Sequence, residues 1–222
     1  RACGQRACRS ASCCGRFSPK SFTPAVIFLH GGFAYGDEDW DMVLPYLKAG
    51  FAVMTPVLRG ENYQEGEFSL YYNEVEDVLN ATEEFLRDSR IDHSRVFIAG
   101  HSAGGTLSLL CAMASKRYRG AVSFSGTMDC RLVERAALLP FDTKDPKEWA
   151  ARSPAAFAAS LQCPTRVYRG DREEFLASTT ELMARKGKDA GRDIESQVVP
   201  GDHMTAVPRA TELSIEFFQS LK

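Results

Sequence analysis

Several features that indicate a membrane, nucleic-acid or metal-binding protein are missing from this sequence. No apolar run approaches the roughly 18 residues that a helix needs to span a bilayer, so no membrane partner is expected. The formal net charge is only −2, and a near-neutral balance gives no electrostatic footprint for nucleic acid. Histidine is also scarce, with four in 222 residues, which leaves few candidates for a catalytic base.

The first 20 residues differ in composition from all the rest. They hold four of the seven cysteines and no acidic residue. Because these cysteines lack the C-x-x-C steps and histidine partners of common zinc sites, we expect no metal site. An acid-poor, Arg- and Ser-containing start is compatible with an organelle transit peptide or with an artefact of the sequence. We therefore expect residues 1–20 to be an unstructured or non-native tail, and the default location is cytoplasmic.

Residues 21–222 alternate short apolar runs with amphipathic stretches. This alternation predicts an α/β fold in one domain, with a mostly parallel sheet of about six or more strands and helices on both faces. The predicted strands are residues 25–29, 51–55, 96–99, 121–124, 165–168 and 194–199. Helices are predicted near residues 40–47, 75–86, 104–115 and 213–221. The Ala-rich insertion at residues 127–162 is a candidate for a small cap.

Gly100-His101-Ser102-Ala103-Gly104 matches the pattern G-x-S-x-G between a predicted strand and a predicted helix. In this context the pattern indicates a nucleophile elbow, in which a strained turn exposes the serine and glycines relieve crowding on either side. Ser102 is therefore the candidate nucleophile. The alternative is an ordinary glycine-rich turn.

A serine nucleophile needs a histidine base, and the sequence offers four candidates. His93 lies in a polar turn, His101 is inside the elbow, and His30 belongs with the glycines that follow the first strand. His203 lies between the last strand and the last helix. The chain order serine, acid, histidine, typical of this fold, agrees with this elimination and selects His203.

The acid that orients the histidine should follow the penultimate strand. Three carboxylates compete there: Asp171, Glu173 and Glu174. Any of them within reach of the His203 Nδ1 atom would fix its tautomer, so the residues alone do not choose between them.

Five short stretches carry a family resemblance: residues 28–33 (FLHGGF), 59–62 (RGEN), 100–105 (GHSAGG), 152–154 (RSP) and 200–203 (PGDH). With these motifs the chain resembles the catalytic domain of the prolyl oligopeptidase family of serine peptidases, in the α/β-hydrolase superfamily. The family usually places an Asp three residues after the glycine that ends the strand. That position here is Glu173, so the resemblance favours Glu173, with Asp171 as the alternative acid.

The resemblance also implies an oxyanion hole. His30-Gly31-Gly32-Phe33 is similar to the family's oxyanion loop, whose backbone N–H groups would come from Gly32 or Phe33, together with Ala103. Some family peptidases carry a Tyr where His30 stands and use its hydroxyl as a further donor. The alternative interpretation is that these glycines form a tight turn after a buried strand.

Together these residues predict a serine hydrolase that cleaves a small peptide, amide or ester substrate through an acyl-enzyme, without a cofactor. A carboxylesterase of the same fold is one alternative. Another is a non-catalytic or truncated α/β-hydrolase-like protein. The oligomeric state stays open.

Overall fold

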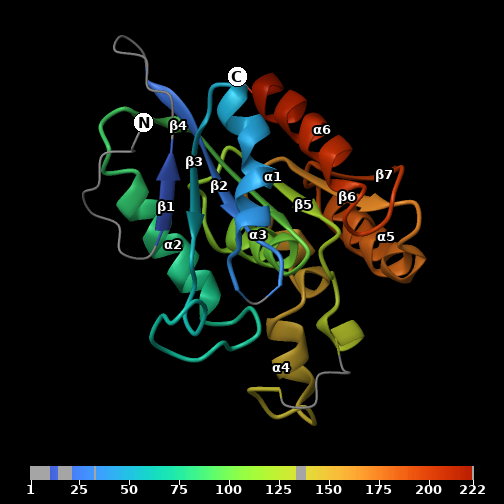
Figure 1. The fold of residues 1–222 in the computed structure, drawn as a ribbon. Helices are drawn as coiled ribbons and strands as arrows, with labels where there is room; N and C mark the ends of the chain where they lie inside the picture. Colours follow the sequence, from blue (N-terminus) through green and yellow to red (C-terminus); the bar gives the residue numbers. More distant parts are fainter. Residues whose placement is uncertain (1–10, 15–21, 33, 134–138, 222) are drawn as a thin grey trace.

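The computed structural model describes residues 11–14, 22–32, 34–133 and 139–221, and it contains a seven-stranded sheet in the order β1-β3-β2-β4-β5-β6-β7 (Figure 1). The strands are β1 (Ala11–Cys14), β2 (Thr23–Leu29), β3 (Ala52–Pro56), β4 (Ile91–His101), β5 (Gly120–Phe124), β6 (Thr165–Gly170) and β7 (Ile194–Val199). Strands β2 to β7 are parallel to their neighbours. The predicted fold class is therefore confirmed.

Strand β1 is the exception, because it pairs antiparallel with β3 at the edge of the sheet. The sequence-based expectation of an unstructured tail was wrong for these four residues. An exposed sheet edge offers unpaired N–H and C=O groups to any nearby extended segment, whatever its side chains. The composition of the tail therefore does not predict this backbone pairing.

Helices cover both faces of the sheet (Figure 1). They are α1 (Asp37–Lys48), α2 (Glu74–Phe85), α3 (Ala103–Ala114), α4 (Pro146–Ala151), α5 (Glu174–Asp189) and α6 (Val207–Ser220). Helices α1 and α6 pack with one apolar cluster, in which the Phe218 ring stacks on Phe97 at a centroid distance of 4.5 Å. Helices α2, α3 and α5 pack with a second cluster on the other face. Alternate residues of the central strands enter the two clusters, which is the reason these strands read as continuous apolar runs.

The insertion at 127–162 joins the second cluster. It contains α4 and the short 3₁₀ turns η1 (Cys130–Val133), η2 (Pro154–Ala156) and η3 (Ala158–Ser160). Trp149 is buried, and Phe141 contacts its ring edge-on at 4.9 Å. These aromatic side chains therefore contribute to the core.

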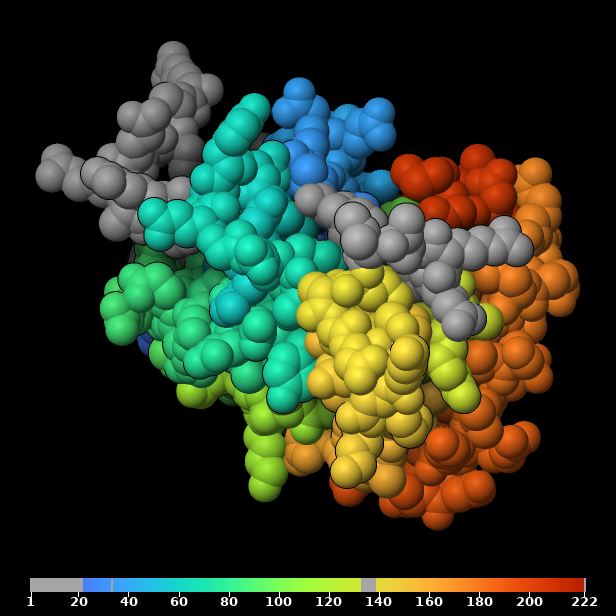
Figure 2. Space-filling model, turned by 90° about the horizontal axis from the view of Figure 1, so that it is seen from below, coloured from blue at the N-terminus to red at the C-terminus, as the bar shows by residue number. Residues whose placement is uncertain are grey.

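Parallel strands end at the same edge of a sheet, and open α/β sheets place their sites there. Figure 2 views the molecule from this carboxyl edge. The loops after β3, β5, β6 and β7 meet on this face, together with the loop that follows β2. Within the described part of the chain, no helix is both long and apolar enough to cross a bilayer.

Candidate active site

Ser102 lies in the sharp turn between β4 and α3. Its backbone has φ 54° and ψ −116°, a conformation that L-residues rarely adopt. The Ser102 N–H donates to the Phe124 carbonyl on the neighbouring strand at 2.8 Å, which fixes the turn against β5. The local geometry is that of a nucleophile elbow.

The two glycines of the G-x-S-x-G pattern allow close backbone contacts. A Cβ atom on Gly100 would lie 2.2 Å from the Gly104 carbonyl oxygen, and one on Gly104 would lie 2.1 Å from the Leu29 carbonyl oxygen. Both contacts are with backbone atoms, which cannot be relieved by a change of side-chain rotamer. Glycine is therefore required at both positions for the elbow to pack between β2 and α3.

We expect Gly104→Ala to lower the free energy of unfolding by more than about 4 kcal/mol, because the added methyl group overlaps the β2 backbone. Urea unfolding followed by circular dichroism measures this loss. Gly36→Ala is the control, since its nearest neighbour would be the Asp39 side chain at 3.9 Å. Equal stability of the two variants would contradict the steric account.

His203 and Glu173 form a hydrogen-bonded pair beside the elbow. The His203 Nδ1 atom lies 2.7 Å from the Glu173 Oε1 atom. The Glu173 side chain is 2% exposed and the His203 side chain 42% exposed, so the carboxylate is enclosed while the imidazole remains open on its other side. No hydrogen bond joins the Ser102 hydroxyl to His203 among the described residues. In substrate-free hydrolases this bond is often long and shortens on binding.

Glu173 occupies the N-cap position of α5, and its second carboxylate oxygen accepts two more hydrogen bonds. Ser125 Oγ donates at 2.5 Å and the Gly170 backbone N–H at 2.7 Å. Burial alone would raise the pKa of Glu173, but the hydrogen bonds from His203, Ser125 and Gly170 outweigh it, and the pKa falls below its ordinary value. Glu173 is therefore an ionised carboxylate that fixes the orientation of the His203 ring.

The other two candidate acids are not brought to His203. Asp171 accepts a hydrogen bond from the Gly201 backbone N–H at 3.0 Å, which ties the β6 loop to the β7 loop. Glu174 is the first residue of α5, where an acidic side chain interacts favourably with the helix dipole. Asp171 and Glu174 thus have structural contacts of their own.

His101 and Ser125 belong to the site although the sequence interpretation gave them no role. The His101 ring is buried, and its Nε2 atom donates to the backbone carbonyl of His203 at 2.8 Å. The two imidazole rings lie 4.7 Å apart. His101 therefore links the elbow to the loop that carries His203. No local pattern signals either contact, because both join residues far apart in the chain.

Burial lowers the pKa of His101, although the bond to His203 and the charge of Glu173 act in the opposite direction. The unfolded chain takes up this proton near pH 6.5, whereas the folded ring resists it. A depressed histidine pKa contributes stability that is present above the unfolded pKa and is lost as the pH falls. We expect His101→Gln to flatten the dependence of unfolding free energy on pH between about 7 and 5.

Urea unfolding of the wild type and of the variant at several pH values checks this expectation. His93→Gln is the matched control because His93 is exposed. If His101→Gln keeps the wild-type slope, His101 does not carry this pH dependence.

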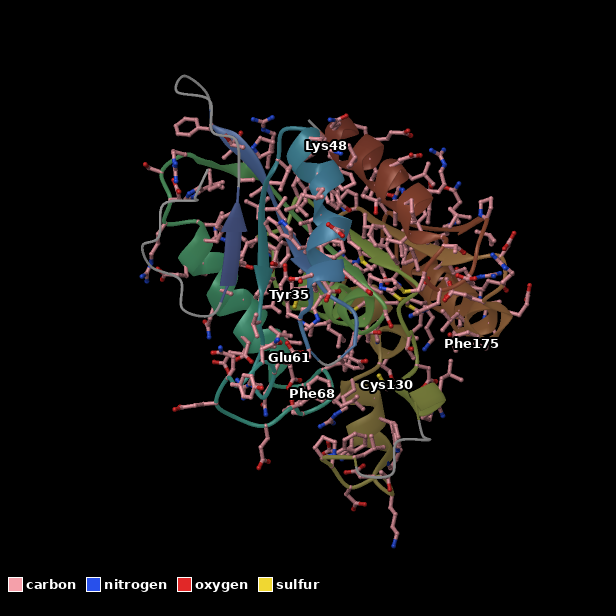
Figure 3. The ribbon with its side chains drawn as sticks, in the orientation of Figure 1. Tyr35, Lys48, Glu61, Phe68, Cys130 and Phe175 are labelled. Carbon is pink, nitrogen blue, oxygen red and sulfur yellow. The ribbon has the colours of Figure 1, made fainter. Side chains whose placement is uncertain are left out.

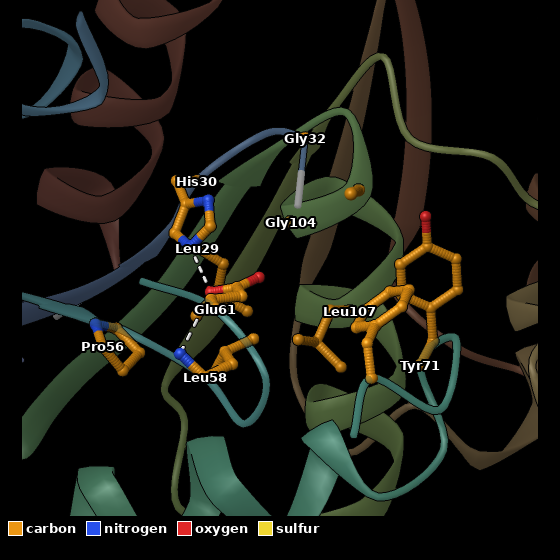
Figure 4. A pocket seen from close by; sticks show the side chains of 11 residues that line it. Leu29, His30, Gly32, Pro56, Leu58, Glu61, Tyr71, Gly104 and Leu107 are labelled. Atoms are coloured by element: carbon orange, nitrogen blue, oxygen red, sulfur yellow. Dashed lines mark hydrogen bonds and ion pairs between the residues drawn. The ribbon is translucent and has the colours of Figure 1, made fainter. Parts of the chain in front are cut away.

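The loop after β2 faces the N-terminus of α3. Gly32 and Ala103 line one small pocket together with apolar side chains such as Leu58 and Leu107 (Figure 4). As the first residue of α3, Ala103 has a backbone N–H without an intrahelical acceptor. Gly32 has φ 69°, which favours glycine. Phe33, the other expected donor, lies outside the described residues.

His30 does not take the place of a side-chain donor in this pocket. Its Nε2 atom contacts Glu61 Oε2 at 3.0 Å and its Nδ1 atom contacts the Gly31 carbonyl at 2.9 Å. Both ring nitrogens are therefore engaged by protein oxygens. His30 is therefore not free to act as a side-chain donor to an oxyanion.

A twisted parallel sheet, a strained serine turn after a central strand and a histidine–carboxylate pair at the carboxyl edge define an α/β hydrolase. The sequence profile described as "Prolyl oligopeptidase family" matches residues 39–214. The chain belongs to this family, whose members are hydrolases of the serine-peptidase type.

Similar proteins agree with this assignment. An uncharacterized peptidase, YtmA of Bacillus subtilis, is 23% identical over 183 residues, which cover 77% of this chain and 71% of YtmA. A puromycin-hydrolyzing peptidase of Mycobacterium tuberculosis superposes with a TM-score of 0.81 at 19% identity over 95% of this chain. The chain spans only 37% of that peptidase.

A putative dienelactone hydrolase from Klebsiella pneumoniae shares the fold over almost its whole length. It superposes with a TM-score of 0.72 at 17% identity, covering 94% of this chain and 92% of the neighbour. At such identities the likeness establishes the fold alone.

Proposed function

We propose that this chain hydrolyses a peptide bond through an acyl-enzyme on Ser102, with His203 as general base and Glu173 as the acid that orients it. The observation that carries the proposal is the 2.7 Å contact between His203 Nδ1 and the buried Glu173 carboxylate, next to a serine in the elbow conformation. A surface histidine has no need of an enclosed carboxylate. A catalytic imidazole does, because it becomes positively charged during the reaction.

In the proposed mechanism, Ser102 Oγ attacks the carbonyl carbon while His203 Nε2 takes its proton. The imidazolium is stabilised by Glu173, and the negative oxygen of the tetrahedral intermediate is held by backbone N–H groups near Gly32 and at Ala103. His203 then protonates the leaving group as the bond to it breaks. Water attacks the acyl-enzyme by the same route in reverse and releases Ser102.

Exposed apolar side chains around the carboxyl edge support a substrate with apolar groups. Large, exposed apolar side chains occur in segments that follow four of the strands: Tyr63 and Tyr72 after β3, Leu132 after β5, Phe175 after β6 and Met204 after β7. Two of them are close in sequence to the catalytic pair. Phe175 lies in the first turn of α5 (Figure 3), and Met204 follows His203 in the sequence. Peptides and short-chain esters both present such groups.

An ester substrate is the second candidate, and the near-complete overlap with the dienelactone hydrolase supports it. Esters and amides pass through the same tetrahedral intermediate, so one site serves both. The preference for esters or amides then depends on how well the site protonates the leaving group, because an amine needs this protonation more than an alkoxide does.

The first test is labelling of the folded protein with a fluorophosphonate probe, followed by mass spectrometry of the modified peptide. We expect a single adduct, on Ser102. The absence of labelling, while a control serine hydrolase reacts, would indicate a non-catalytic α/β-hydrolase-like protein. Comparison of p-nitrophenyl butyrate with alanine and proline p-nitroanilides then separates esterase from peptidase activity.

A further inference from the structure

The segment Arg59-Gly60-Glu61-Asn62 has no part in the mechanism described above, yet it lies against the loop after β2. It follows β3, and Glu61 lines the same pocket as Gly32 and Ala103 (Figure 4). Figure 3 shows Glu61 and Tyr35 close together at the carboxyl end of the sheet. The contacts of these residues define a specific role for the segment.

Glu61 holds the start of the loop. Its Oε2 atom accepts from His30 Nε2 at 3.0 Å and from the Leu58 backbone N–H at 3.0 Å, and both Glu61 and His30 are almost fully buried. Because a carboxylate and the Gly31 carbonyl can only accept, the doubly protonated ring is the form of His30 that satisfies both contacts. Burial alone would lower the pKa of His30, but the hydrogen bond and charge of Glu61 raise it overall.

Asn62 holds the other end of the loop. Its side-chain oxygen accepts from the Tyr35 backbone N–H at 2.7 Å, and its side-chain nitrogen donates to the Tyr35 carbonyl at 2.9 Å. Tyr35 in turn contacts the His30 ring edge-on at 5.6 Å. Two consecutive residues thus fix positions 30 and 35, which flank Gly31 and Gly32.

The segment is itself held in place. The Arg59 guanidinium donates two hydrogen bonds to Asp77 of α2, at 2.7 and 2.6 Å, and the Arg59 backbone N–H donates a third at 3.3 Å. Asn62 and Tyr63 have φ values of 46° and 68°, in the left-handed region that asparagine adopts more readily than most residues. From this conformation the Asn62 side chain makes its two hydrogen bonds with Tyr35.

We propose that residues 59–62 form a bracket that fixes Gly31 and Gly32, through His30 and Tyr35, in the geometry required for oxyanion binding, with Glu61 and Asn62 as positioning residues. The inference rests on the proposed function and assigns a role to groups that do not touch the substrate. A backbone donor stabilises the transition state only while it points at the developing oxyanion. Anchoring both ends of a glycine-containing loop prevents that donor from drifting.

Glu61→Gln tests the bracket, because it keeps the size of the side chain and removes its charge. We expect kcat for p-nitrophenyl butyrate to fall about 10- to 100-fold, less than the complete loss of one oxyanion donor. KM should change by less than about threefold, because ground-state binding does not use this donor. Asn62→Ala should lower kcat in the same way, without removing a buried charge.

A trifluoromethyl ketone inhibitor provides the readout that a merely structural role would not change. It forms a hemiketal anion with the serine, so its Ki should rise by the same factor as kcat/KM falls. Glu83→Gln is the matched control, since Glu83 pairs with Arg117 on the surface, and it should keep wild-type constants. In the double variant of His30→Gln and Glu61→Gln, kcat should fall no further than in the worse single variant, because both act through one contact.

The bracket is overturned if folded Glu61→Gln and Asn62→Ala both keep kcat within about twofold, or if the loss appears in KM and inhibitor binding is unchanged. Circular dichroism and thermal unfolding establish that each variant is folded. If Glu61→Gln does not fold, the kcat of Asn62→Ala alone decides. Failure of the wild type itself to react with the fluorophosphonate probe would instead remove the proposed function, and the bracket with it.

Discussion

Ser102→Ala is expected to lower kcat by about 10⁶-fold and to abolish labelling by a fluorophosphonate probe, because the proposed reaction has no other nucleophile. Turnover of p-nitrophenyl butyrate and probe labelling measure the two effects. The fold should be retained, since the hydrogen bond that anchors this residue comes from its backbone N–H.

Ser94→Ala is the control for Ser102→Ala. Ser94 is exposed, and its backbone N–H and its hydroxyl both donate to Asp92. It should keep wild-type turnover and labelling. Labelling that persists in Ser102→Ala would locate the reactive group elsewhere and contradict the mechanism.

Glu173→Gln is expected to lower kcat by about 10⁴-fold with little change in shape. The Oε2 atom of Glu173 receives hydrogen bonds from Ser125 and Gly170, so the amide oxygen of a glutamine must occupy that position. Its NH₂ group then faces His203 Nδ1 and donates to it. This contact stabilises the imidazole tautomer with the proton on Nε2, which cannot accept the proton of Ser102.

Asp171→Asn and Glu174→Gln are the matched controls for this prediction. An asparagine at 171 keeps the oxygen that accepts from Gly201, so the loop should not move. Both variants should retain kcat within about threefold, and the measurement is again ester or anilide turnover in folded protein. A large loss in Asp171→Asn with normal activity in Glu173→Gln would reverse the assignment of the acid.

The sequence predicts the elbow because its steric requirements are local. Gly100 and Gly104 lie within four residues of each other along the chain, and their spacing already states which side chains cannot be present. The central strands could also be predicted from the sequence, because burial on both faces requires a continuous run of apolar residues. Helix α5 was not among the predicted helices because its buried face includes Thr180 and Gly187 beside Leu176, Met183 and Ala184, which leaves only a weak apolar stripe.

The contacts of the acid depended on how two loops meet. Asp171, Glu173 and Glu174 are chemically similar, and the chain gives no measure of their distances from His203. The fold turns Glu173 back toward Gly170 and inward to His203, while Asp171 bonds to Gly201. The family pattern indicated Glu173 by position alone.

What the sequence determined by itself was the α/β architecture, the elbow at Ser102 and the order of the candidate residues, because each depends on periodicity or on short spacing. What only the tertiary structure decided was which groups touch: Glu173 with His203, His101 with the His203 backbone, and Glu61 with His30. These contacts join residues 30 to 102 positions apart. Their geometry depends on the packing of separate strand ends at one edge of the sheet, and no local pattern encodes it.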